Sequence, residues 1–441
     1  MKLSALIIKS TVIGALGGLL FGFDTAVISG TTAQLTTRYH LSQGALGFTV
    51  ASALWGTVIG AIFAGIPGQR FGRRDSLRVM AAFYVVSALG CAFAWSLPSL
   101  IFFRVIGGLG IGGSSVLGPM YIAELAPAEW RGRLVGFFQV NIVVGILLAY
   151  ISNALLGTLH LGAVEWRWQL GVSAIPAVLF LIALYFIPRS PRWLLTQGRK
   201  EEALTVLEQT GIAQPRQEMD DILAAIHEEG TGKQDSITAR KYRLPVFIAI
   251  SVGMFSQLTG INAVLYYLND IFALAGASKM SGNVQAIAVG ATNLAATLFA
   301  MSIIDKFGRK KLLITGTVGL IGCLLAIGYI FKTRHHLEFL VWLLMGFIAS
   351  FAISHGAVVW VYISEVFPNR LRARGQSLGS SSHWVSNAII SLVFPLMAAV
   401  SGSAPFFFFA AMMVLDLVLV VSLYPETAGV PLEQMQQAIA K

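Results

Sequence analysis

Twelve long apolar segments constrain this chain more than any other feature of its sequence. Each extends for about 20 residues, and they begin near residues 8, 46, 77, 100, 133, 168, 244, 283, 312, 338, 375 and 404. Because an α-helix rises about 1.5 Å per residue, such a segment crosses a hydrocarbon layer of about 30 Å. Only 12% of the residues are charged, and the mean hydropathy is +0.74. The sequence therefore predicts an all-α membrane protein with twelve transmembrane helices and no separate soluble domain.

Basic residues gather in alternate connections between these segments. When the N-terminus is placed in the cytoplasm, most of the 31 lysines and arginines fall on the cytoplasmic side, as the positive-inside rule requires. We therefore expect a multi-pass protein of the plasma membrane, the inner membrane of a bacterium, with both termini in the cytoplasm. This topology also explains the net charge of +10, so no nucleic-acid partner is expected.

Three short polar signatures occur twice, at nearly the same offset. They are Arg70-Phe71-Gly72-Arg73-Arg74 with Lys306-Phe307-Gly308-Arg309-Lys310, Glu124-x-x-Pro127-x-x-x-Arg131 with Glu365-x-x-Pro368-x-x-x-Arg372, and Pro188-Arg189-Ser190 with Pro425-Glu426-Thr427. The repeat predicts two pseudo-symmetric six-helix bundles, residues 1–188 and 244–425, followed by a cytoplasmic tail over 426–441. A cytoplasmic linker, 189–243, joins the bundles, and the patterns of 201–208 and 219–229 in it predict short amphipathic helices.

Internal repeats of this kind are typical of secondary transporters, in which the substrate binds near the bilayer midplane and each side opens in turn. In each half we expect the duplicated glutamate to pair with the arginine that ends the same signature, and so to close a cytoplasmic gate. The residues of the predicted gate are Arg73, Glu124, Arg131, Asp305, Arg309, Glu365 and Arg372. The alternative is that these charges only fix the topology.

Asp24 lies inside the first apolar segment, where a carboxylate costs about 2.5 to 3.5 kcal/mol and is functional by default. Counting from Lys9 places Asp24 roughly 8 Å below the outer surface, and counting from Ser99 places Arg104 at the same depth. We therefore expect a buried pair in which Asp24 carries a coupled proton and Arg104 tunes its proton affinity. The alternative is a fixed structural ion pair.

Amide and aromatic side chains at the middle of the apolar segments point to a neutral substrate rich in hydroxyl groups. Amides donate and accept hydrogen bonds at once, and an aromatic face suits a sugar ring. The candidate contacts are Gln257, Asn262, Asn293, Trp360 and Trp384, with Phe21 and Gln139 from the first half. In a continuous helix Gln257 and Asn262 would lie about 140° apart and flank one wall. The alternative for each amide is a hydrogen bond between packed helices.

Six motifs, in order along the whole chain, resemble those of the sugar porter family of the major facilitator superfamily. They are Phe21-Gly22-Phe23-Asp24-Thr25, Arg104-Val105-Ile106-Gly107-Gly108, Pro119-Met120-Tyr121-Ile122-Ala123-Glu124, Gln257-Leu258-Thr259-Gly260-Ile261-Asn262, Ser364-Glu365-Val366-Phe367-Pro368 and Pro425-Glu426-Thr427. The resemblance implies the major facilitator fold and an alternating-access carrier with a sugar site walled by both halves. The chain is most similar to bacterial proton-linked pentose and hexose symporters, many of which carry one proton with each sugar.

The resemblance also extends the predicted sugar site. Tyr266, Gly356 and His383 join the candidate contacts, with Gly356 allowing close approach of the backbone. Where the family often has glutamine, this chain has Ser256, Ile146 and His383. The predicted pocket is therefore less rich in amides, and the sequence leaves the sugar open.

The sequence thus predicts a sugar transporter, a proton-coupled symporter of a pentose or a hexose. A passive monosaccharide uniporter is the alternative, and a membrane sugar sensor that does not transport is a more remote one. No nucleophile with a base, metal cluster or nucleotide-binding loop indicates an enzyme, so no cofactor or metal is expected. The expected partners are the monosaccharide, a proton and the lipid bilayer, and the protein is expected to be a monomer. We expect a packing role for His355, a packing role is also the alternative to a sugar contact for His383, and Asp416 has no interpretation from sequence.

Overall fold

The computed structural model describes residues 3–127, 129–231, 237, 239–367 and 371–427, and these residues form helices without β-strands. Twelve helical stretches in this part of the chain are long and apolar enough to cross a membrane, and each predicted start falls inside one of them. They are Ala5–Gly30, Gln43–Arg70, Arg73–Ala92, Leu97–Leu125, Arg131–Thr158, Gly162–Ala183, Arg243–Tyr266, Ser281–Ile304, Arg309–Thr333, Leu337–Ile363, Arg374–Val400 and Ala404–Leu423. The prediction of an all-α protein with twelve transmembrane helices is confirmed.

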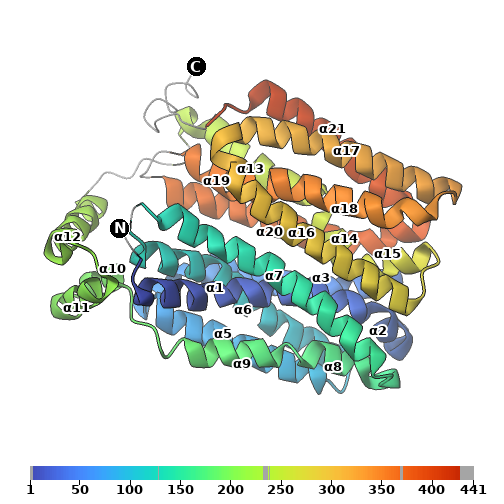
Figure 1. Cartoon of the computed structure of the whole chain (residues 1–441), viewed down its shortest axis with the longest axis horizontal. Helices are drawn as coiled ribbons and strands as arrows, with labels where there is room; N and C mark the ends of the chain where they lie inside the picture. The colour runs from blue at the N-terminus through green and yellow to red at the C-terminus, as the bar shows by residue number, and fades with distance from the viewer. Residues whose placement is uncertain (1–2, 128, 232–236, 238, 368–370, 428–441) are drawn as a thin grey trace. The chain divides into compact units, whose positions relative to one another are not determined.

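Several of these stretches combine two or more helical elements. The elements of the first half are α1 (Ala5–Val27), η1 (Ile28–Gly30), α2 (Thr32–Tyr39), α3 (Gln43–Phe63), α4 (Gly65–Arg70), α5 (Arg73–Ala92), α6 (Leu97–Leu125), α7 (Arg131–Thr158), η2 (Gly162–Val164), α8 (Glu165–Gly171) and α9 (Ala174–Ala183). The elements of the second half are α13 (Arg243–Leu258), α14 (Ile261–Tyr266), α15 (Leu268–Leu274), α16 (Lys279–Phe307), α17 (Arg309–Thr333), η4 (Leu337–Phe339), α18 (Leu340–Phe351), η5 (Ala352–Gly356), α19 (Ala357–Glu365), α20 (Arg372–Val400) and α21 (Ala404–Leu423). Helix α5 lies alongside α6 and α9, and α17 lies alongside α18 and α21 (Figure 1).

The described residues form two compact units. Unit 1 contains described residues of 1–24, 55–145 and 170–234, and unit 2 contains those of 25–54, 146–169 and 235–441. Residues 25–54 and 146–169 belong to the first sequence half, yet they pack with the helices of the second. In unit 2, α3 and α20 touch along their backbones at Gly47. A Cβ at this position would lie 2.2 Å from the carbonyl oxygen of Leu392 on α20.

Glycines allow helices α1 and α7 of unit 1 to touch along their backbones. A Cβ on Gly22 would lie 1.8 Å from the carbonyl oxygen of Ile142, and one on Gly145 would lie 2.0 Å from that of Leu19. Small residues that let backbones approach are the usual basis of helix packing in membranes. The glycines that surround Phe21 and Asp24 in the sequence therefore fix the position of α1 in this unit.

The helix of span 7 is interrupted at Gly260, between α13 and α14. Gly260 has φ +85°, and a Cβ there would lie 2.3 Å from the ring of Phe409. Only glycine meets both conditions without strain. The interruption falls between Gln257 and Asn262, so the continuous helix from which an angle of about 140° was counted is not present there.

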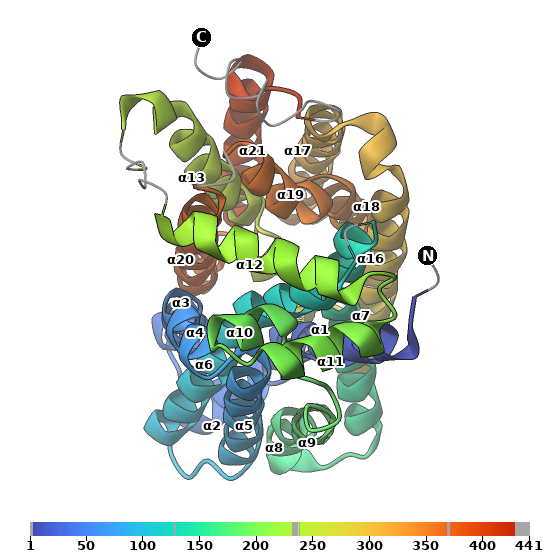
Figure 2. The same cartoon turned by 90° about the vertical axis from the view of Figure 1, so that its left-hand side faces the viewer.

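Three short helices follow α9 in unit 1: α10 (Pro191–Thr196), α11 (Lys200–Thr210) and α12 (Pro215–Thr231). The two predicted linker helices correspond to α11 and α12, whereas α10 was not expected from the sequence. Trp193 of α10 donates its indole N–H to the carbonyl oxygen of Gln69 on α4 at 2.8 Å. Figure 2 looks onto this end of unit 1, where α10 lies beside α4 and α6.

Candidate functional site

An amide and imidazole network lies beside the interruption of span 7 in unit 2. Asn262 Nδ2 donates to Gln257 Oε1 at 2.8 Å, and Gln257 Nε2 lies 3.0 Å from Nε2 of His383 on α20. Ser256 Oγ lies 3.0 Å from the other ring nitrogen, Nδ1, and 2.8 Å from the carbonyl oxygen of Gly253. The structure thus brings together three predicted sugar contacts and one residue at which the chain departs from the family.

His383 is the shared neighbour of Ser256 and Gln257. Gln257 Nε2 lies 3.0 Å from Nε2 and 3.2 Å from Nδ1 of the ring, so the amide can donate to whichever ring nitrogen carries the lone pair. The short side chain of Ser256 leaves room for the ring. The two departures from the family pattern therefore form one contact.

Aromatic rings flank His383. The centroid of Trp360 on α19 lies 4.9 Å from that of His383 with the rings tilted by 51°, and Trp384 lies at 5.2 Å edge to face. Gln257 is 2% exposed and Trp384 is 3% exposed, whereas Trp360 is 37% exposed. Trp360 therefore offers the open aromatic face of the network.

Asn387, which the sequence analysis did not consider, belongs to the same helix face as His383. It is fully buried, its Nδ2 lies 3.4 Å from the hydroxyl of Tyr266, and Ser391 donates to its Oδ1 at 3.2 Å. Asn387 follows His383 by four residues, so helical spacing places both on one face of α20. That spacing is the signal that could have identified it.

The remaining predicted sugar contacts lie on other elements of the chain. Asn293 is 5% exposed on α16, and Gly356 ends η5 four residues before Trp360. Phe21 and Gln139 are partly buried on α1 and α7 of unit 1. The role of these four residues as sugar contacts stays a prediction.

Asp24 and Arg104 form the pair that equal depth predicts. Arg104 Nη1 lies 3.7 Å from Asp24 Oδ1 in unit 1, and the side chains are 3% and 30% exposed respectively. The arginine is therefore held in the interior of the unit, and the carboxylate is partly exposed. The predicted pairing is confirmed, whereas its role in proton coupling belongs to the proposal below.

Two equivalent polar clusters occupy the repeated signatures, one in each unit. In unit 1, Arg73 binds Glu124 with Nε at 2.9 Å and Nη2 at 2.8 Å, and the hydroxyl of Ser190 donates to the same carboxylate. In unit 2, Arg309 Nη2 lies 3.0 Å from Glu365, to which Thr427 also donates. Each cluster therefore joins one residue from each of the three repeated signatures.

The cluster of unit 1 corrects the predicted pair of Glu124 with Arg131, whereas the predicted pair of Glu365 with Arg372 stays a prediction. Arg131 is exposed at the start of α7 and has no ion pair with Glu124. The reason is geometric: Arg73 starts α5, which packs along the whole of α6 and so reaches Glu124 near its end. The side chains of Asp305 and Arg372 lie outside the described residues, and Glu365 pairs with Arg309. Ser190 and Thr427 were missed as members, although the repeat contains both.

Two further polar contacts of unit 2 join residues of the two sequence halves. Thr32 donates to Asp270 Oδ1 at 3.0 Å, and Lys279 Nζ lies 2.7 Å from both carboxylate oxygens of Glu165. Burial raises the pKa of Asp270 to about 6, although the hydrogen bond from Thr32 lowers it. The other oxygen of Asp270 is out of contact with solvent and has no hydrogen-bond partner among the described residues.

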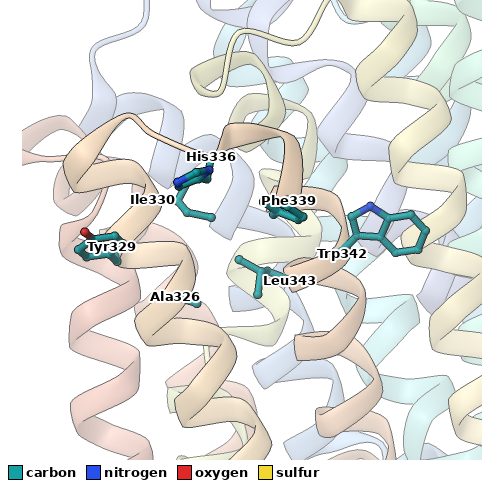
Figure 3. Close-up of a pocket in the computed structure, with 7 residues that line it drawn as sticks. All are labelled: Ala326, Tyr329, Ile330, His336, Phe339, Trp342 and Leu343. Carbon is teal, nitrogen blue, oxygen red and sulfur yellow. The ribbon is translucent and has the colours of Figure 1, made fainter.

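An apolar groove between α17 and α18 is not part of this site. It lies at the surface of unit 2, and its aromatic side chains are mostly exposed, which is typical of a lipid-facing aromatic belt. Figure 3 shows the residues that line it, which are Ala326, Tyr329, Ile330, His336, Phe339, Trp342 and Leu343. In the part of the chain that the structure describes, no group of three or more His, Cys, Asp or Glu side chains could hold a metal ion.

Secondary transporters are often built from internal repeats, and their polar site residues gather where a membrane helix is interrupted. This chain has both features. The sequence profile of the family described as "Sugar (and other) transporter" matches residues 10–439. The chain therefore belongs to this family of sugar transporters.

Known proteins that resemble the chain along nearly its whole length include sugar transporters. The D-xylose-proton symporter of Escherichia coli (strain K12) is 36% identical over 472 residues, which cover 98% of this chain and 96% of that protein. The arabinose-proton symporter of Bacillus subtilis (strain 168) is also 36% identical, with 96% and 92% covered. The partially occluded inward-open structure of the xylose transporter XylE from E. coli matches with a TM-score of 0.87 at 35% identity, over 97% of this chain and 100% of that chain. The resemblance to sugar porters of the major facilitator superfamily is confirmed.

Proposed function

We propose that this protein is a symporter that moves a monosaccharide together with a proton across the plasma membrane by alternating access. The observation that carries this proposal is the network of Gln257, Asn262 and His383 beside the open face of Trp360. Such a network offers donors and acceptors to hydroxyl groups and an aromatic face to a sugar ring. The two relatives named above are proton symporters of pentoses, which supports the same substrate class here.

The network can exchange partners without leaving a buried amide unpaired. When no sugar is bound, Asn262 donates to Gln257, and Gln257 donates to His383. A sugar hydroxyl both donates and accepts, so it can replace either bond one for one. This exchange avoids the cost of about 1 to 3 kcal/mol for an unsatisfied buried group. The proposed sugar contacts are Phe21, Gln139, Gln257, Asn262, Tyr266, Asn293, Gly356, Trp360, His383 and Trp384.

The Asp24–Arg104 pair supports proton coupling. The carboxylate is 30% exposed and the guanidinium 3% exposed, so in this proposal Asp24 takes up the proton while Arg104 stays inside the unit. Protonation of Asp24 leaves a buried cation with a neutral neighbour, which is costly in low dielectric. Helix packing around Arg104 therefore favours a different arrangement once Asp24 is protonated, and this links the proton to the change of access.

The repeated clusters suit a gate at the cytoplasmic face. In this account residues 1–188 and 244–425 are the two moving halves, 189–243 and 426–441 are cytoplasmic, and both termini lie inside the cell. The clusters around Glu124 and Glu365 brace the inner end of each half, and Arg131, Asp305 and Arg372 contribute charge to the same face. The protein acts as a monomer.

The test uses purified protein in proteoliposomes and Asp24→Asn. The variant should exchange labelled sugar across the membrane but fail to accumulate it against a gradient when the outside is made acidic. Uphill accumulation by Asp24→Asn would refute the coupling role. A panel of D-xylose, arabinose and glucose as competitors identifies the substrate, and failure of all of them to compete would refute a monosaccharide site of this kind.

A further inference from the structure

His355 and Asp416 form a buried pair in unit 2 that the mechanism above does not use. His355 Nε2 lies 3.0 Å from Asp416 Oδ2, and the residues are 2% and 0% exposed. Thr317 of α17 lies 3.4 Å from the same carboxylate oxygen. The contact thus ties α21 and α17 to the element that contains His355. Ionisable groups inside a membrane segment are costly and are functional by default.

The histidine lies in a π-helical turn. Element η5 (Ala352–Gly356) separates α18 from α19, and such turns within α-helices are frequent at functional sites. Phe351 stacks on the His355 ring at 6.3 Å, and Ser354 Oγ lies 3.3 Å from its Nδ1. Both ring nitrogens therefore have a partner, and one partner, Asp416, lies on another helix, so this contact anchors the turn from outside its own segment.

The turn determines which residues of α19 face the sugar network. One additional residue in a helical turn rotates everything after it by about 100°. Trp360 lies five residues after His355, and its ring lies 4.9 Å from His383. If the turn relaxed, the same rotation would carry Trp360 away from His383. The orientation of the open aromatic face therefore depends on a turn that His355 and Asp416 hold in place.

We propose that His355 and Asp416 are positioning residues for sugar binding, because their contact holds the π-helical turn that places Trp360 against His383. The inference rests on the proposed sugar site. It assigns a role to Asp416, which has no interpretation from sequence alone. A pair that served only to pack α21 would support folding but would not act through Trp360.

The experiment compares Asp416→Leu, Trp360→Ala and the double variant in proteoliposomes, with D-xylose as the probe of equilibrium exchange. Asp416→Leu should raise the half-saturation concentration about tenfold, equivalent to about 1.4 kcal/mol, and leave the maximal exchange rate nearly unchanged. Asp416→Asn keeps an oxygen for His355 and should restore near wild-type affinity. Val420→Ala, a buried change one turn along α21, should leave the half-saturation concentration unchanged.

The double variant decides between positioning and packing. If the pair acts through Trp360, Asp416→Leu adds nothing to the loss caused by Trp360→Ala, whereas independent effects add. Additive losses, or an unchanged half-saturation concentration in Asp416→Leu, would overturn the inference. If Asp416→Leu does not fold, His355→Leu removes the same hydrogen bond and replaces it in the experiment. If neither variant folds while Val420→Ala does, the pair serves folding and the inference is overturned. Unchanged affinity in Trp360→Ala alone would instead refute the proposed sugar site.

Discussion

Substitution of Glu124 should destabilise the protein more than the equivalent substitution of Glu365. Glu124 accepts two hydrogen bonds from Arg73 and one from Ser190, and each bond to a charged group contributes about 1.5 to 3 kcal/mol. The Arg73 and Glu124 side chains are 12% and 11% exposed. Because breaking a buried ion pair costs about 3 to 5 kcal/mol, we expect Glu124→Gln to lose stability of this order.

The equivalent cluster of unit 2 supplies the matched control. Glu365 is 25% exposed, against 11% for Glu124, so Glu365→Gln should cost less because solvent screens a more exposed ion pair. Thermal unfolding of the purified variants in detergent, followed by tryptophan fluorescence, gives the order of stability. Equal destabilisation, or a larger loss in Glu365→Gln, would contradict the reasoning from contacts and burial.

Three further predictions concern other parts of the molecule. Burial holds the pKa of Asp270 at about 6, above the value of about 3.9 for an exposed aspartate. The state in which Asp270 is buried therefore binds more protons than a state in which it is exposed. Its stability falls as the pH rises through about 6. Amide hydrogen exchange of α15, corrected for its intrinsic pH dependence, should accelerate over that range, and Asp270→Asn should remove the effect; an unchanged pH response in the variant would count against it. Gly22→Ala should abolish folding and transport because its Cβ would lie 1.8 Å from a backbone oxygen. Gly65→Ala, with open space around it, should behave as wild type in expression and uptake assays. If both variants were tolerated, α1 would not pack as described. Ser256→Gln should weaken sugar binding because the longer side chain displaces His383, and adding His383→Gln should recover part of the loss; additive losses in measured affinity would show that the two positions do not compensate each other.

The twelve membrane helices and the repeat could be predicted because they depend on local properties of the sequence. Apolar length decides whether a segment crosses a bilayer, and a duplicated signature is visible without any structure. Depth counting also predicted the Asp24–Arg104 pair, because a straight helix converts residue number into distance. The sequence also singled out Gln257, Asn262 and His383, which the structure joins in one network.

Other features depend on packing between helices that are distant in sequence. The interruption at Gly260 follows from the ring of Phe409, and the partner of Glu124 follows from the path of α5 along α6. Neither contact can be read from spacing within one segment. Ser256 and His383 were each identified as departures from the family, but only the structure shows that they touch.

Proton movement driven by sugar tests the central claim most directly. Wild-type proteoliposomes in weakly buffered medium, without any imposed gradient, receive sugar from outside while the external pH is recorded. The account predicts that the outside becomes more alkaline as sugar enters with protons, and that Asp24→Asn takes up the same sugar down its gradient without a pH change. Sugar entry without alkalinisation in the wild type would contradict symport, and alkalinisation that persists in Asp24→Asn would contradict the role of Asp24.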